Sequence, residues 1–64
     1  MESARAELSS VGSQLDDITK RVLDAAHLYE QGGREDVSHE LFEVERSLRA
    51  ASRRLVRATR DAAR

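Results

Sequence analysis

Apolar residues recur along this chain at alternating steps of four and three positions. In the first half they are Ala4, Leu8, Val11, Leu15, Ile18, Val22, Ala25 and Tyr29, and in the second half Val37, Leu41, Val44, Leu48, Ala51, Leu55, Ala58 and Ala62. This is the a/d pattern of a heptad repeat, whereas strands would alternate with period two. With Leu8 and Leu41 both labelled a, the pattern predicts two long helices, at about residues 3–31 and 34–63.

The two patterns are separated by one sharp break, Gln31-Gly32-Gly33-Arg34. Gly32 suits the left-handed conformation that ends many helices, and Gly33 is an acceptable N-cap for the next helix. Glu35 and Asp36 then lie in the first turn of that helix, where negative charge complements the helix dipole. A connection this short, a turn at residues 32–33, predicts that the helices run antiparallel and side by side.

Folding the chain about Gly33 brings the two apolar patterns into register. Tyr29 then faces Val37, Ile18 faces Leu48, and Ala4 faces Ala62, so every layer pairs an a position with a d position. Several layers pair a large side chain with a small one, which keeps the layer volume even. We therefore expect an all-α fold, an antiparallel two-helix coiled-coil hairpin that forms a single domain over residues 1–64.

One flank of this hairpin, made by the e and b heptad positions, is poor in charge. A contiguous apolar flank is unusual on a soluble monomer, and a second hairpin would cover it most simply. We therefore expect a homodimer, a four-helix bundle with two-fold symmetry. The residues predicted at this interface are Gly12, Asp16, Thr19, Leu23, Ala26, Phe42, Glu45, Arg49, Ser52 and Val56. Among them, Asp16, Glu45 and Arg49 are expected to set the orientation of the copies through charge pairing.

Size and composition strengthen this expectation. A chain of 64 residues buries only about 60 % of the surface that it exposes when unfolded, so a core of its own is marginal. The chain has no cysteine, so no disulfide can compensate. No apolar run approaches the ~18 residues of a membrane span, and we expect a cytoplasmic protein that does not engage a membrane.

The second helix is polarised, with acidic residues at its start and arginines toward its end. Five of these arginines form a predicted outward ridge: Arg46, Arg53, Arg57, Arg60 and Arg64. Arginine binds phosphate bidentately, so the ridge is a candidate site for nucleic acid or another anionic partner. The same distribution also complements the helix dipole, and no aromatic residue interleaves the arginines to stack on bases. Nucleic-acid binding is therefore the alternative function that the sequence predicts.

Candidate chemistry is sparse. His27 with Glu30 and His39 with Glu43 have metal-site spacings, but both histidines fall at outward f positions, away from each other. Asp16 and Asp17 are adjacent on a helix and do not face each other, so a proton-sharing pair is not expected. We predict no catalytic residues, no metal site and no cofactor.

In outline, two long antiparallel helices joined by a glycine turn, the chain resembles small secreted helical hairpins of the WXG type. The chain has no tryptophan and its turn lacks the motif that defines those proteins, so the resemblance implies a shape alone. The function expected from the residues is a non-enzymatic protein–protein interaction or assembly module, acting as adaptor or regulator. The alternatives are a small nucleic-acid-associated protein and a subunit that folds only with a different partner chain.

Overall fold

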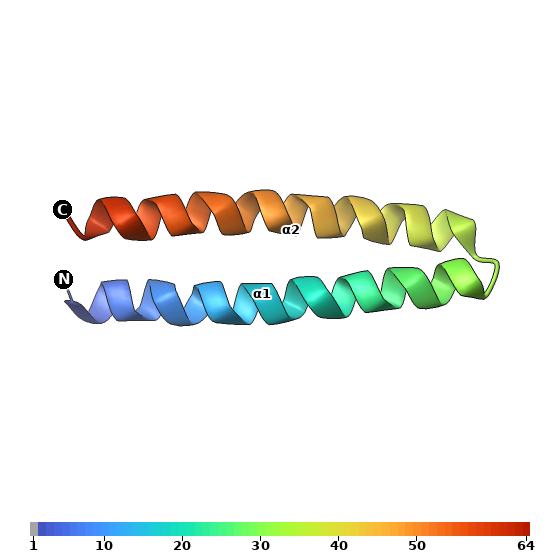
Figure 1. Ribbon diagram of the computed structural model, residues 1–64, viewed down its shortest axis with the longest axis horizontal. Coiled ribbons are helices and arrows are strands. Elements are labelled where there is room, and N and C mark those ends of the chain that lie inside the picture. Colours follow the sequence, from blue (N-terminus) through green and yellow to red (C-terminus); the bar gives the residue numbers. More distant parts are fainter. Residues whose placement is uncertain (1) are drawn as a thin grey trace.

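A computed structural model describes residues 2–64 and has two helices, α1 (Glu2–Gln31) and α2 (Glu35–Ala62). The helices run antiparallel along their whole length, so that both chain ends lie at one end of the rod and the turn lies at the other (Figure 1). The Cα atoms span 48 × 14 × 9 Å. The all-α hairpin predicted from the heptad pattern is thereby confirmed. Neither helix is long and apolar enough to cross a membrane.

The turn lies at residues 32–33, as predicted, and is a glycine cap whose left-handed residue is one position later than predicted. The backbone N–H of Arg34 donates to the Tyr29 carbonyl at 2.9 Å, and the N–H of Gly33 donates to the Glu30 carbonyl at 3.2 Å. This pair of bonds is the Schellman motif, and its left-handed residue is Gly33, with φ of 80°. The prediction that gave this role to Gly32 is wrong, because Gly32, which directly follows α1, has no positive φ and still donates to the Leu28 carbonyl at 3.0 Å as a helical residue would.

Arg34 takes the N-cap position of α2, which was predicted for Gly33, and makes no side-chain capping bond there. Its guanidinium instead donates two hydrogen bonds of 3.2 Å to the Asp36 carboxylate. These bonds, together with a hydrogen bond from the Val37 backbone, hold the pKa of Asp36 below its ordinary value. The start of α2 is thus stabilised by charge.

The two helices pack through heptad positions a and e, rather than a and d. At the e positions, Ala26 is fully buried, Ser38 is 1 % exposed, and Thr19 and Glu45 are each 9 % exposed. Three residues at d positions are by contrast 39–45 % exposed: Val11, Ile18 and Val44. The prediction that every layer joins an a position to a d position is therefore wrong. The seam, as the a and e positions are called from here on, is rotated about each helix toward e.

Small residues at e explain this rotation. They include Gly12, Thr19, Ala26, Ser38, Ser52 and Thr59. A methyl group built on Gly12 would lie 3.8 Å from Leu55 of the other helix, so the backbone of α1 faces the α2 leucine directly. The seam hydroxyls are also satisfied locally, since Thr19 and Thr59 donate to the carbonyls of Leu15 and Leu55 at 2.7 and 2.8 Å. Burying these polar residues therefore costs little.

Candidate association surfaces

Rotation of the seam leaves a continuous apolar surface on one broad face of the hairpin. The surface is made by the heptad d positions, here called the d stripe: Ala4, Val11, Ile18 and Ala25 in α1, and Val37, Val44, Ala51 and Ala58 in α2. Because the helices are antiparallel and both turn a and e toward each other, their d positions point to the same side. All eight residues are apolar, and none of them carries a polar atom in its side chain.

The edges of the d stripe carry the g positions of both helices. In α1 these are Glu7, Gln14, Arg21 and Leu28, and in α2 they are Glu40, Ser47, Arg54 and Asp61. Leu28, at the turn end, is 68 % exposed and enlarges the apolar area there. Ile18 and Ala25 of the stripe line a shallow depression with Leu41 of the opposite helix. The result is an apolar strip that runs the length of the rod and has mixed charges along its borders.

The flank predicted as the dimer interface has a different character. Five of its ten residues lie in the intramolecular seam, where they face the other helix of the same chain: Gly12, Thr19, Ala26, Glu45 and Ser52. Leu23 and Phe42 are partly covered, and the rings of Phe42 and His27 form a T-shaped pair with a centroid distance of 5.3 Å. Val56 remains open, with 61 % of its surface exposed. Of the apolar residues in this predicted interface, Val56 is thus the one most exposed to a second chain.

The charged residues of that flank make contacts inside the hairpin. The Ser52 hydroxyl donates to the Asp16 carboxylate at 3.1 Å, which joins α1 to α2. Arg49 pairs with Glu45 one turn earlier in α2. Glu45 is shielded in the seam while Arg49 is mostly exposed, so the arginine extends over the carboxylate from outside. The Ser52–Asp16 hydrogen bond thus helps to define the arrangement of α2 on α1, whereas the Arg49–Glu45 pair lies within α2.

A groove lies on the same side near the open end of the rod. Its floor is apolar, formed by Leu8, Leu55 and Val56, and its depth comes from small side chains that include Ser9, Gly12 and Ala63. Arg5 and Arg60 also line it, one from each helix. The groove is open to solvent along its length, so it is a shallow surface feature with one basic residue from each helix on its walls.

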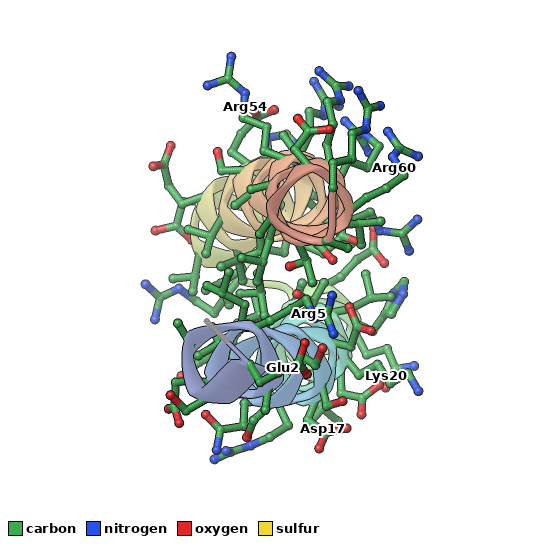
Figure 2. All side chains as sticks on the ribbon, turned by 90° about the vertical axis from the view of Figure 1, so that its left-hand side faces the viewer. Glu2, Arg5, Asp17, Lys20, Arg54 and Arg60 are labelled. Atoms are coloured by element: carbon green, nitrogen blue, oxygen red, sulfur yellow. The ribbon has the colours of Figure 1, made fainter. Side chains whose placement is uncertain are left out.

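The predicted arginine ridge lies on the exposed surface of α2. At its ends, Arg46 and Arg64 pair with Glu43 and Asp61, both at 3.7 Å. The three central arginines have no acidic partner within 4 Å among residues 2–64: Arg53, Arg57 and Arg60. Figure 2 shows several guanidinium groups gathered on the flank of α2 that carries Arg60, with Lys20 of α1 on the same side. This side of the rod is accordingly basic near its open end.

In the part of the chain that the structure describes, the histidines lie outside any cluster of metal-binding groups. His27 is exposed and its Nδ1 lies 3.5 Å from a carboxylate oxygen of Glu30. His39 is exposed on α2. Within residues 2–64, no group of three or more histidine, aspartate or glutamate side chains is arranged to hold a metal ion. The sequence's outward placement of both histidines agrees with their exposure.

Comparison with known proteins gave no match: neither a family model, nor a curated protein, nor a solved structure is significantly similar to this chain. Candidate surfaces must therefore be weighed on their own chemistry. The heptad pattern predicts that the residues of the d stripe face the interior, whereas the structure exposes three of them, Val11, Ile18 and Val44. The signal that could have placed them outside is the run of small residues at e, which offers a closer-packing seam than the valines and isoleucine at d.

Proposed function

We propose that this protein is a non-enzymatic assembly module, a helical hairpin that associates with a second copy of itself through the d stripe. The observation that carries the proposal is the exposure of Val11, Ile18 and Val44 on one uninterrupted apolar face. A large exposed apolar patch on a globular protein usually marks an interaction site. A second copy offers the same stripe, so the surface is complementary to itself in the way that a two-fold interface requires.

The size of the face supports this proposal. From the Cα extents of 48 and 14 Å, the broad face has a footprint of roughly 670 Å² before side chains are added, against about 800 Å² per partner in a standard stable interface. Burying this face would also stabilise the dimer, because each Å² of apolar surface removed from water contributes about 25 cal/mol. Ala26 is the one apolar residue among residues 2–64 that the hairpin buries fully by itself. Association would therefore supply much of the core that the single chain lacks.

A matched pair of valines in α2 tests the proposal. Val44 lies on the d stripe and Val56 lies on the opposite flank, and both are exposed. We expect Val44→Asp to reduce the mass seen by analytical ultracentrifugation from two chains to one chain of 7.2 kDa, because the dimer would bury two carboxylates. Val56→Asp should leave the mass unchanged.

The reverse pattern, dissociation by Val56→Asp alone, would assign the interface to the flank predicted from the sequence. If the unmodified protein had the mass of a single chain at all concentrations, self-association would be rejected. In that case the d stripe would instead be explained by a different partner chain, with which this subunit folds.

The arginine ridge favours a second candidate function, the binding of nucleic acid. Its support is the group of central arginines, Arg53, Arg57 and Arg60, whose charges no carboxylate within 4 Å offsets among residues 2–64. Fluorescence anisotropy with labelled duplex DNA at about 50 mM salt tests this function, since phosphate contacts are strongest at low salt. Binding that falls when Arg53 and Arg57 are changed to glutamine would support it, and no binding at that salt would exclude it.

A further inference from the structure

We infer that the second copy lies end-reversed on the d stripe, with the turn of each hairpin beside the open end of the other. The inference rests on the proposed self-association and adds the orientation of the partner. It comes from the distribution of charge along the rod. The half near the turn, residues 17–47, has eight acidic and four basic residues and so a charge of −4. The remaining half has four acidic and seven basic residues and a charge of +3.

Two arrangements satisfy two-fold symmetry when the hairpins stack face to face. With the open ends together, α1 of each copy lies over α2 of the other. With the ends reversed, α1 lies over the second α1 and α2 over the second α2. The stacked helices are antiparallel in both arrangements, so the helix dipoles favour neither of them. Side-chain charge and packing must therefore determine which of the two arrangements is more stable.

The charge along the rod favours the reversed arrangement. It places each acidic turn half beside a basic open half, whereas the other arrangement places like halves together. Complementary potentials of this kind select the register and orientation of an interface. Within α2 the contrast is largest, because residues 35–45 hold five carboxylates and residues 53–64 hold five arginines.

Packing along the stripe gives the reversed arrangement a register. If the two-fold axis crosses α2 between Val44 and Ala51, Val44 lies level with Ala51 of the second copy. Val37 then lies level with Ala58 of that copy. Each contact pairs a larger residue with alanine, which is the volume match that even packing needs.

The same register pairs two charges at the border of the stripe. Glu40 comes within one residue of the height of Arg54 in the second copy, and symmetry makes a second such pair. Both residues are exposed, and neither has an ion-pair partner within 4 Å among residues 2–64. In the arrangement with open ends together, Glu40 would lie level with Leu28 and Arg54 with Gln14 of the other copy. Glu7 would lie near Asp61 there, which is repulsive.

Cysteine cross-linking distinguishes the two arrangements, because the natural chain has no cysteine. A disulfide needs Cα atoms closer than about 7 Å. An equimolar mixture of Val37→Cys and Ala58→Cys chains, with one chain tagged, should give the mixed disulfide on mild oxidation. A mixture of Val11→Cys and Ala58→Cys should not. In the reversed dimer those two residues lie roughly 30 Å apart, at 1.5 Å per residue along the helix.

Charge reversal tests the Glu40–Arg54 pairs separately. Glu40→Arg and Arg54→Glu should each weaken dimerisation about tenfold in sedimentation equilibrium, since two exposed pairs become repulsive. The double variant should recover the original affinity. Efficient cross-linking of Val11→Cys with Ala58→Cys, or a double variant no tighter than either single one, would overturn the reversed arrangement while leaving the dimer in place. A monomeric unmodified chain would overturn the dimer itself.

Discussion

At the residue scale, Gly33 is the position where conformation is most constrained. Its φ of 80° lies in the left-handed region, where a side chain costs roughly 1–2 kcal/mol. Gly32, its neighbour, is not among the positive-φ residues. Two adjacent glycines that look alike in the sequence thus have different roles.

We expect Gly33→Ala to lower the free energy of unfolding by about 1 kcal/mol, because alanine must adopt the left-handed conformation. Gly32→Ala is the matched control. Its methyl group would meet the Leu28 carbonyl oxygen at 3.4 Å, an ordinary contact, so stability should stay the same or rise slightly. Urea unfolding followed by circular dichroism measures both. Equal losses in the two variants would contradict the assignment of the cap to Gly33.

At the element scale, the e positions of the seam hold unusually small and polar residues. Gly12, Thr19, Ser38 and Ser52 occupy places where a coiled coil normally has larger apolar side chains. Every fully buried side-chain nitrogen or oxygen within residues 2–64 has a hydrogen-bond partner. The e positions are therefore satisfied in their hydrogen bonds but add few large apolar side chains to the seam.

Gly12 gives a direct test of this seam. It lies inside α1, where glycine costs about 1 kcal/mol relative to alanine, and a methyl group there would make a normal 3.8 Å contact with Leu55. We expect Gly12→Ala to raise the free energy of unfolding by up to about 1 kcal/mol. Gly12→Leu should lower it, because the larger side chain would force the helices apart. A stabilising leucine in thermal or urea unfolding would show that Gly12 does not face the seam.

At the scale of the whole molecule, the proposed dimer would couple folding to association. A rod of 48 × 14 × 9 Å with a single fully buried apolar residue among residues 2–64 has little core of its own. If the d stripe is the interface, a higher protein concentration favours the folded dimer by mass action, and the melting temperature rises with protein concentration. The Val44→Asp chain should lose this dependence and melt lower, and the Val56→Asp chain should retain it. A melting temperature that does not change with concentration in all three would argue for a monomer.

The amino-acid sequence by itself determined the helices, the turn and the antiparallel hairpin. Heptad spacing and a Gly-Gly break are local signals, and they need no knowledge of distant contacts to be interpreted. The predicted bounds of about 3–31 and 34–63 compare with Glu2–Gln31 and Glu35–Ala62 in the structure. The exposure of both histidines was also readable from their f positions, since the side opposite the seam remains outward after a modest rotation.

Only the tertiary structure decided which apolar positions face inward. The positions a, d and e form one wide stripe on each helix, and a two-helix contact can cover only part of it. The sequence predicts Gly12, Thr19 and Ala26 at e as a surface for a second chain, yet in the structure they lie in the seam between α1 and α2. Val11, Ile18 and Val44 are thereby left at the surface. Heptad spacing cannot reveal this choice, because it depends on how side chains of two helices fit together across the seam.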